Sequence, residues 1–412
     1  MLKGGVWPFV RQKPYDIIAN PFDMPKAIFI SAFNSAPLTS DVNFALAGMD
    51  ELFQKGLDYI VKLTDGKTHL NIDGKIKPFK TFKTKSEDGT VFVSTVKELE
   101  AGVDISVLRE DGMMIPLPVG SYKKETGVSF RVEVEGVVSE VIKLETEDDV
   151  VEEEIVEVIL DPSRVFKKAE GVELNQFTGP HPSGNVGVHI HHIDPINKGE
   201  SVWYLKPQDV IAIARLFVEG KYDVSRVIAL TGPQILKPRY YKAIAGMSVT
   251  NLLIDNIRAG ENRVISGDVL TGQHIDTDGT LGFYHTSVTV IEEGKEQEFL
   301  GWMMPGFDKF SNSRTFPSWI MPNRKYALNA NIHGEERAYV MTGEYEKVLP
   351  MDIYPTQLIK ACMIEDIELM ENLGIYEVSP EDLALCEFVC TSKIEVQSII
   401  RHGLDLIRKE NS

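Results

Sequence analysis

The pattern of apolar residues changes abruptly near residue 77 and changes back near residue 165. Between these points, short runs of alternating apolar and polar residues, such as TVFVSTV and VSFRVEVEGVVSEVIKL, are separated by Asp-Gly, Thr-Gly and Glu-Gly pairs. Alternation with a period of two predicts strands, and such pairs are typical of tight turns. The stretch has no helical period. We therefore expect a β-rich, acidic unit over residues 77–165, inserted into a larger fold.

Both flanks of this stretch have the pattern of an α/β fold. Residues 26–32, KAIFISA, form a short apolar run bounded by turn-forming residues, which predicts a buried strand. Residues 42–67 follow with helical spacing, and residues 206–220 place a proline in the first turn and a glycine at the end of a further helix. We expect one α/β domain in two parts, residues 1–76 and 166–225.

The next part of the chain has the element order of a β-grasp unit. From residue 226 the pattern predicts a strand, a Gly-Pro turn, a second strand and a short helix that begins near Ser248. RVISGDVLTG and LGFYHTSVTVI supply further strands. A hairpin followed by a helix and more strands predicts a β-grasp domain over residues 226–305.

Residues 306–412 form the last segment, which we expect to end in a helical bundle. Ser379 and Pro380 stand before two acidic residues, an arrangement that favours a helix start. Ser392 and Glu395 have the spacing of a capping box for a second helix. The apolar face of that helix consists of Val396, Ile399, Ile400 and Ile407.

Composition narrows the class of protein. The net charge of -18 disfavours nucleic acid or anionic lipid as the main partner, because phosphates would be repelled. Three cysteines are too few for a disulfide framework and suit a reducing compartment. The longest apolar runs fall short of the roughly 20 residues that span a bilayer, and no secretory leader is apparent. These features predict a soluble, cytoplasmic chain.

Four of the nine histidines lie in GPHPSGNVGVHIHHIDP, residues 179–195. The alternation of Val188 and Ile190 with histidines predicts a strand, on which His189 and His191 point to the same face. A catalytic zinc usually takes three protein ligands, and His181 or Asp194 could supply the third. A metal site at His181, His189 and His191 is therefore one hypothesis. The alternative is a set of structural, hydrogen-bonded histidines.

Further blocks of sequence carry a family resemblance. They are GGVWPFVRQKPYDIIANP, GPHPSGNVGVHIHHIDP, IALTGPQILKPRYYKAIAG, RVISGDVLTG, FLGWMMPGFDKFSNSRTFPSW, GEYEKVLPMDIYPTQLIKA and EDLALCEFVC. In this order they resemble the NqrA family, a component of the Na+-translocating NADH:quinone reductase. The resemblance covers most of residues 4–70 and 175–410. The family begins with a further domain of lipoyl-carrier type, which does not precede GGVWPF, so we expect a shortened chain. Residues 77–165 match nothing in the family.

The resemblance implies a fold and a cofactor content. It implies a Rossmann-like core related to the flavin- and NADH-binding subunit of complex I, joined to a β-grasp domain of SLBB type and a C-terminal helical domain. In the complex I relative a glycine-rich loop holds phosphates through backbone N–H groups. The corresponding loop here, residues 4–9, has only two glycines, Trp7 and Phe9 add bulk, and Pro8 has no N–H. We therefore expect no NADH or flavin on this chain.

The cysteines lead to the same expectation for iron–sulfur clusters. The complex I relative holds a cluster on four cysteine thiolates, whereas this chain has only Cys362, Cys386 and Cys390. We expect these three to be small buried apolar residues. The flavins, iron–sulfur centre and NADH site are then expected on other subunits, and no cofactor is expected to be tightly bound here.

Trp7, Phe9 and Arg11 are the candidate residues for contact with a quinone. They combine stacking surface with a hydrogen-bond donor, which suits a headgroup with two carbonyl acceptors. The alternative, which we favour, is that Trp7 and Phe9 fill the vacant nucleotide cleft.

The resemblance implies a peripheral subunit on the cytoplasmic side of the bacterial inner membrane. It would dock on the other subunits of the Nqr complex, chiefly the multi-span quinone-side subunit, where reduction of ubiquinone or menaquinone drives sodium export. The isolated chain is expected to be inactive. The alternative function is a metal-dependent soluble enzyme that uses His189 and His191, and a third is a stand-alone β-grasp ligand-binding module.

Overall fold

The chain divides into two compact units. A computed structural model describes residues 1–75, 79–85, 91–95, 106–108, 114–116, 133–134, 137–138, 154–160, 164–295, 300–301, 303–321 and 324–411. The main unit consists of Met1–Gly74 and Val165–Ser412, and the second unit is Lys75–Arg164.

The second unit contains antiparallel strands. Its sheet has the order β11-β5-β6, and two further pairs are β7-β8 and β9-β10. Their bounds are β5 Phe79–Lys85, β6 Val91–Thr95, β7 Ser106–Leu108, β8 Met114–Pro116, β9 Glu133–Val134, β10 Val137–Val138 and β11 Glu154–Leu160. The short alternating runs of the sequence therefore form strands wherever this unit is described.

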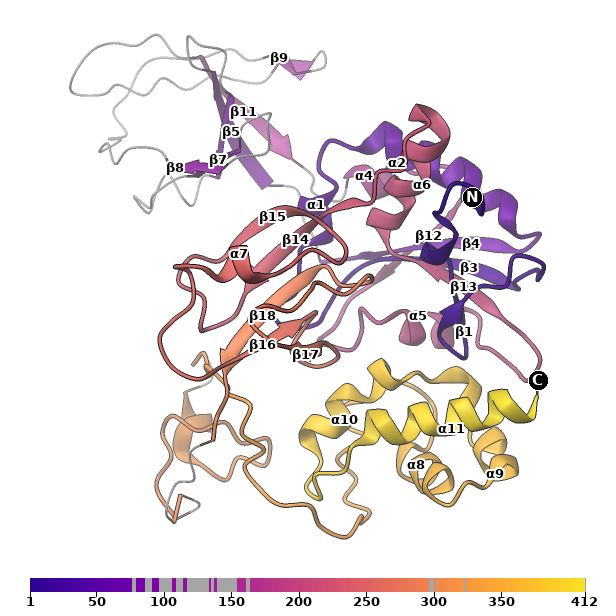
Figure 1. Ribbon diagram of the computed structural model, residues 1–412, viewed down its shortest axis with the longest axis vertical. Helices are drawn as coiled ribbons and strands as arrows, with labels where there is room; N and C mark the ends of the chain where they lie inside the picture. The colour runs from indigo at the N-terminus through magenta and orange to yellow at the C-terminus, as the bar shows by residue number, and fades with distance from the viewer. Residues whose placement is uncertain are drawn as a thin grey trace. The chain divides into compact units, whose positions relative to one another are not determined.

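The main unit is built on a mixed six-stranded sheet, in the order β12-β4-β3-β13-β1-β2 (Figure 1). The strands are β1 Arg11–Lys13, β2 Ile17–Ile18, β3 Ala27–Ala32, β4 Lys67–Asp73, β12 Glu173–Phe177 and β13 Val202–Leu205. Neighbouring strands from β12 to β13 are parallel, whereas β1 is antiparallel to β13 and to β2. The strand predicted over residues 26–32 is confirmed as β3.

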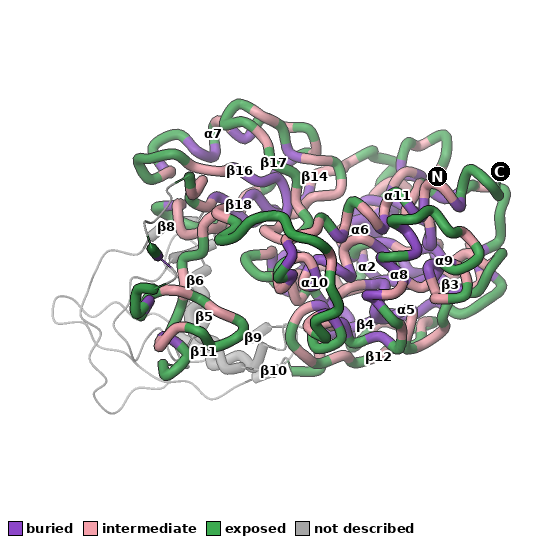
Figure 2. Tube along the Cα trace, turned by 90° about the horizontal axis from the view of Figure 1, so that it is seen from below, coloured by how far each residue is buried: buried purple, intermediate pink, exposed green. Residues whose placement is uncertain are grey.

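Alternation along β3 divides the core of this sheet into two layers. Ile28 and Ile30 pack with the helices α2 and α6 on one face, whereas Ala27 and Phe29 pack with α5 and the C-terminal helices on the other. Figure 2 shows the buried residues concentrated in this region. The helical elements are η1 Trp7–Phe9, α1 Val42–Ala45, α2 Asp50–Ile60, η2 Val61–Leu63, α4 Arg164–Lys167, α5 Val186–Ile193 and α6 Pro207–Glu219.

Gly56 sets the close approach of α2 to α6. A Cβ atom at this position would lie 2.5 Å from both Cγ1 and the carbonyl oxygen of Val210. The neighbouring α2 residues Phe53, Leu57 and Ile60 are fully buried. Glycine therefore lets the two helices pack at a distance that any larger residue would prevent.

The β-grasp part has its own sheet and its own core. Its sheet order is β15-β14-β18-β16-β17, with β14 parallel to β18 and the other pairs antiparallel. The elements are β14 Ser225–Thr231, β15 Arg239–Ile244, α7 Thr250–Leu253, β16 Asn262–Ser266, β17 Gln273–Ile275 and β18 Ser287–Glu292. The predicted hairpin, short helix and following strands are confirmed, and β17 is an additional short strand.

The C-terminal part is helical, as predicted. Its elements are η3 Pro317–Ile320, α8 Pro355–Met363, α9 Ile367–Asn372, η4 Ile375–Glu377, η5 Pro380–Leu383, α10 Ala384–Val389 and α11 Val396–Glu410. Ser379 and Asp382 form a capping box at the start of η5. The capping box predicted at Ser392 is wrong, because α11 begins only at Val396 and the Ser392 hydroxyl donates to the carbonyl oxygen of Ala338. None of the described helices is long and apolar enough to cross a membrane.

The division into units predicts the outcome of a deletion. We expect removal of residues 75–164, with a short Gly-Ser linker between Gly74 and Val165, to leave a soluble chain that unfolds cooperatively. The reason is that the main unit contains its own buried clusters. Circular dichroism during urea unfolding measures the result. An insoluble product, or one without a cooperative transition, would show that the deleted residues belong to the main core.

Candidate functional site

Trp7 is built into the core beside the sheet. Its side chain is 9% exposed, its indole N–H donates to the carbonyl oxygen of Ala19 at 2.7 Å, and its ring meets Trp203 edge-on at 5.5 Å. A buried indole normally has such a partner for its N–H. Trp7 therefore fills the space under the N-terminal loop with its polar atom satisfied.

Phe9 connects the N-terminal loop to the β-grasp part. The side chain is 1% exposed and stacks on Phe283 with 5.2 Å between ring centroids. The guanidinium of Arg226 lies 5.7 Å from the Phe9 ring. The Tyr284 hydroxyl donates to the carbonyl oxygen of Pro8 at 2.9 Å. These contacts make the loop an interface between two parts of the fold.

Several backbone N–H groups of the loop donate to carbonyl oxygens of the same loop. Gly4 and Gly5 donate to Met1 and Leu2, and Phe9 and Val10 donate to Val6 and Trp7. A Cβ atom on Gly4 would lie 2.3 Å from the side chain of Leu216. A phosphate cradle needs free N–H groups and open space above them. The N–H groups at these four positions are not free, and the space above Gly4 is not open.

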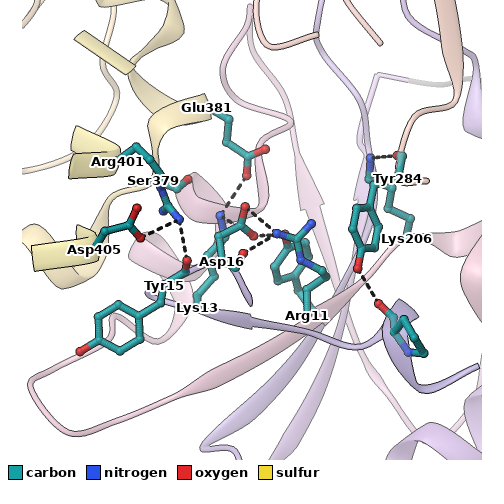
Figure 3. A network of polar contacts seen from close by, with 12 residues as sticks. Arg11, Lys13, Tyr15, Asp16, Lys206, Tyr284, Ser379, Glu381, Arg401 and Asp405 are labelled. Carbon is teal, nitrogen blue, oxygen red and sulfur yellow. Dashed lines mark hydrogen bonds and ion pairs between the residues drawn. The ribbon is translucent and has the colours of Figure 1, made fainter. Parts of the chain in front are cut away.

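Arg11 belongs to a group of charged residues that we call the junction network (Figure 3). Its members are Arg11, Lys13, Asp16, Glu381 and Arg401. Its guanidinium is 2.9 Å from the carboxylate of Asp16 and 4.3 Å from the centre of the Tyr284 ring. The Arg11 side chain is 17% exposed. Arg11 is therefore partly accessible, but its charge is already paired.

Lys13 is the most deeply buried cation of the junction network. Its side chain is 3% exposed, and its ammonium lies 3.2 Å from Glu381 and 3.7 Å from Asp16. Burial alone would lower the pKa of Lys13, but the two carboxylates outweigh it and raise the pKa. The Tyr204 hydroxyl also donates to Asp16. The lysine thus remains charged where an unpaired cation would be unfavourable.

The junction network joins segments that are distant in the chain. Asp16 belongs to the turn between β1 and β2, whereas Glu381 belongs to η5 in the C-terminal part. Arg401 on α11 donates to the carbonyl oxygen of Tyr15 at 2.8 Å and lies 3.7 Å from Asp405. Sequence reasoning missed this network except for Arg11, because nothing local pairs Lys13 with a residue 368 positions away.

The junction network predicts a specific sensitivity to acid. Desolvation would raise the pKa of Asp16, but Lys13 and Arg11 outweigh it and lower the pKa from 3.8 to about 2. The ionised carboxylate therefore stabilises the fold above about pH 4, and this contribution disappears as the pH falls toward 2. We expect Asp16→Asn to lower the free energy of unfolding at pH 7 by on the order of 1–2 kcal/mol.

Asparagine is the suitable replacement because residue 16 has a φ of 56°. Urea unfolding of both proteins between pH 7 and pH 2 tests the prediction. The difference between the wild type and Asp16→Asn should shrink as the pH falls below 4. A difference that stays constant over this range would contradict the assignment.

Asp209 and Arg226 form a second charged pair behind the loop. They lie 3.4 Å apart, and both side chains are 3% exposed. Asp209 also accepts a hydrogen bond from the backbone N–H of Lys206, at the start of α6. Burial raises the pKa of Asp209, although the charge of Arg226 opposes this shift. The sequence shows Asp209 only as an acidic residue in the first turn of a helix.

The histidine-rich segment forms a helix, so the predicted strand is wrong. Asn185 has the extended backbone of an N-cap, and α5 runs from Val186 to Ile193. Positions 186 to 190 are all buried, because the first part of the helix lies between the sheet and the C-terminal helices. Where nearly every side of a helix is buried, alternating apolar residues do not distinguish it from a strand.

His189 is a core residue of this helix. Its ring lies 4.1 Å from Phe177 and 6.4 Å from Phe33 between centroids, and its side chain is fully buried. Burial lowers its pKa to about 4, so the ring is neutral at pH 7. Nε2–H then donates to the carbonyl oxygen of Ser183 at 2.9 Å.

The other three histidines have different partners. The backbone N–H of Asp352 donates to Nε2 of His191 at 3.0 Å, so Nδ1–H donates to Glu377 at 2.7 Å. His192 donates to the carbonyl oxygen of Pro350, and His181 contacts the Ser35 hydroxyl at 3.1 Å. Within the described ranges, no group of three or more His, Cys, Asp or Glu side chains could hold a metal ion.

The three cysteines are buried and free of disulfides. Burial raises the pKa of Cys362 and of Cys386 to about 12, so both remain thiols at pH 7. Cys390 accepts a hydrogen bond from the Tyr345 hydroxyl at 2.9 Å. The prediction that they are small buried residues is confirmed.

Comparison with known proteins covers nearly the whole chain. A family model described as the NqrA second alpha/beta domain matches residues 1–94 and 151–222, and one described as the NQRA C-terminal domain, NQRA_SLBB, matches residues 227–277. The first match reaches into residues 77–165 from both sides. The expectation that this stretch matches nothing in the family is therefore wrong, because this match covers both of its ends and curated relatives align across all of it.

Curated relatives align over the full length. In Yersinia pestis bv. Antiqua (strain Angola), the A subunit of the Na(+)-translocating NADH-quinone reductase is 32% identical over 411 residues, which is 100% of this chain and 73% of that protein. The protein of the same name from Rhodopirellula baltica (strain DSM 10527 / NCIMB 13988 / SH1) is 34% identical over 98% of this chain and 71% of that protein.

Similarity to solved structures is weaker. An NAD+-reducing [NiFe]-hydrogenase in the air-oxidized state aligns with a TM-score of 0.33 and 11% identity, over 66% of this chain and 41% of that chain. This similarity is too low to support an argument. The identity to curated relatives over the whole chain is decisive: the protein belongs to the NqrA family of the Na+-translocating NADH-quinone reductase.

Proposed function

We propose that this chain is a peripheral subunit of a Na+-translocating NADH:quinone reductase, on the cytoplasmic side of the bacterial inner membrane. The observation that carries the proposal is the 32–34% identity to NqrA relatives over 98–100% of the chain. The complex would couple quinone reduction to sodium export. In this assembly the partners are the other subunits, chiefly the multi-span subunit on the quinone side.

We further propose that the chain itself carries no redox cofactor. The support lies in the N-terminal loop, where Trp7 and Phe9 occupy the space and Gly4, Gly5, Phe9 and Val10 direct their N–H groups to carbonyl oxygens of the same loop. Two of the three cysteines have pKa values raised to about 12, which disfavours the thiolate that a cluster would need. The flavins, iron–sulfur centre and NADH site would then belong to other subunits.

The proposal includes a Rossmann-like core over residues 1–76 and 166–225, related to the flavin subunit of complex I. Four parallel strands with helices against both faces support it. The remaining boundaries are residues 77–165 for the inserted unit, 226–305 for the β-grasp domain of SLBB type and 306–412 for the C-terminal segment. The loop at residues 4–9 would occupy the place of the phosphate-binding turn.

The purified chain provides a direct test of the cofactor proposal. We expect it to be colourless, with no flavin or iron–sulfur absorption between about 350 and 500 nm. Absorption spectroscopy, with flavin release by acid as a second measurement, checks this result. Bound flavin at one molecule per chain would contradict it.

Coexpression tests the assembly. The chain carries an affinity tag and is produced together with the other subunits of a Na+-translocating NADH-quinone reductase. We expect these subunits to copurify and the complex to reduce quinone in a sodium-dependent reaction. A tagged chain that is recovered alone, while the other subunits form an active complex without it, would overturn the proposal.

Variants of the loop then test a role at the quinone end. Arg11→Gln and Trp7→Phe keep most of the packing while they change the donor and the stacking surface. If these residues contact quinone, quinone reduction should fall while NADH oxidation by an artificial acceptor is retained. Loss of both activities would indicate failed assembly, and retention of both would leave Trp7 as a space-filling residue and Arg11 as the ion-pair partner of Asp16.

A further inference from the structure

A loop between the β-grasp part and the last helices exposes many large apolar side chains. We call residues 303–321 and 324–328 the basic aromatic segment, which follows β18 and is drawn in orange in Figure 1. Its exposed apolar residues are Met303 at 63%, Met304 at 58%, Phe307 at 58%, Phe310 at 43%, Trp319 at 53%, Ile320 at 65%, Met321 at 41% and Leu328 at 44%. Such a concentration on one segment is typical of an interaction surface.

These side chains belong to one compact, folded loop. Phe316 packs closely on Gly306: a Cβ atom on Gly306 would lie 2.5 Å from the Phe316 ring. The Ser318 hydroxyl donates to the carbonyl oxygen of Lys309, and the ammonium of Lys309 donates to Gly301 at 3.0 Å. Short turns satisfy several of its backbone N–H groups internally. The exposed apolar residues therefore project from a folded loop.

The segment carries positive charge on an acidic protein. It contains four cationic residues and one acidic residue, whereas the whole chain has a net charge of -18. Arg314, Arg324 and Lys325 are exposed, and among the described residues none of them forms an ion pair with a carboxylate. Arg314 lies 5.9 Å from the Trp319 ring centre, and Arg324 lies 5.8 Å from that of Tyr326.

We propose that the basic aromatic segment binds the surface of a bilayer that contains anionic phospholipid. Tryptophan beside cations suits the headgroup region, where the ring lies among the headgroups and the cations meet phosphates. The charge of the whole chain supports this occupant, because an acidic surface is repelled by the same bilayer, whereas the cations of this segment are complementary to it. The negative charge of the whole chain disfavours contact with anionic lipid. The chain would therefore bind the bilayer in the orientation that brings the basic aromatic segment to the lipid surface.

The inference goes beyond the proposed function and does not require assembly, so the isolated full chain tests it. The chain is mixed with vesicles of phosphatidylcholine alone or with added phosphatidylglycerol, and bound protein is measured by sedimentation. We expect binding to the anionic vesicles and release at high salt, because the attraction is screened. No binding to anionic vesicles, or equal binding to both kinds, would overturn the inference.

Charge variants locate the surface. We expect the triple variant Arg314→Glu, Arg324→Glu and Lys325→Glu to bind anionic vesicles on the order of 100-fold more weakly than the wild type. The matched control reverses three exposed lysines elsewhere, Lys55→Glu, Lys168→Glu and Lys237→Glu. Both variants change the net charge equally, so an equal loss in the two would overturn the assignment to this segment.

Apolar variants test the second component of binding. We expect Phe307→Ser, Trp319→Ser and Ile320→Ser together to reduce binding at moderate salt. The control is Phe22→Ser, Met24→Ser and Ile254→Ser, at positions 93%, 61% and 60% exposed. Equal unfolding midpoints for all proteins show that folding is intact. If the segment variants bind vesicles normally but fail to copurify with membrane subunits, the surface binds protein and the lipid proposal is wrong.

Discussion

Asp209→Ala is expected to lower the free energy of unfolding of the main unit by about 3–5 kcal/mol. The variant leaves the guanidinium of Arg226 with 3% exposure and removes the carboxylate that lies 3.4 Å from it. It also removes the acceptor for the N–H of Lys206 at the start of α6. A buried cation without its partner is strongly unfavourable, which is why the expected loss exceeds that of an ordinary surface change. Urea unfolding at pH 7 measures the effect.

Two controls make this result specific. Asp209→Leu combined with Arg226→Met removes both charges, and we expect it to recover most of the lost stability, because no unpaired charge then remains. Glu173→Ala breaks the 2.7 Å ion pair between Glu173 and Lys67, whose side chains are 47% and 68% exposed, respectively. Because this pair is exposed, we expect no change in the unfolding midpoint. If Asp209→Ala behaved like Glu173→Ala, the Asp209–Arg226 pair would be unimportant for stability.

Phe9→Ala is expected to cost about 3–5 kcal/mol of stability. The ring is 1% exposed and stacks on Phe283, so its removal opens a cavity between the N-terminal loop and the β-grasp part. The Arg226 guanidinium, 5.7 Å from the ring, would also lose its aromatic neighbour. Differential scanning calorimetry should show a lower unfolding temperature for the main unit.

Phe22→Ala is the matched control, because Phe22 is 93% exposed and should be replaced without cost. Phe9→Leu should retain most of the stability, since it leaves a smaller cavity. Phe9→Leu also separates two interpretations of the loop. If Phe9 only fills space, an assembled complex with this variant should keep its KM for quinone, whereas direct contact predicts a higher KM. Equal stability losses for Phe9→Ala and Phe22→Ala would contradict the packing described here.

Much of the fold could be predicted because its signals are local. The apolar run at β3, the proline and glycine that bound α6, and the element order from β14 to β18 each depend on neighbours within one element. The helical character of the C-terminal part follows from the same kind of periodicity. The error at Ser392 shows the limit of such signals, because its hydroxyl bonds to Ala338, 54 positions before it in the chain. A capping motif in the sequence cannot indicate that the serine hydroxyl will donate to a distant carbonyl group instead of capping the helix.

The candidate site could be predicted only in part. The loop at residues 4–9 was predicted to be filled, because two aromatic residues and a proline stand where a phosphate cradle needs glycines. The partners that fix this filling, Trp203, Phe283 and Arg226, are all more than 190 positions away and leave no mark near the loop. The same holds for the junction network, in which Lys13 pairs with Glu381.

The sequence by itself determined the strand β3, the helix α6, the order of the β-grasp part and the resemblance to the NqrA family, because these depend on residue type and spacing. Only the tertiary structure decided that the histidine-rich segment is a helix, since α5 is buried on nearly every side and its pattern fits either element. It also decided which charges are buried. A buried charge is stable only beside a partner, and that partner is supplied by folding, from a distant part of the chain.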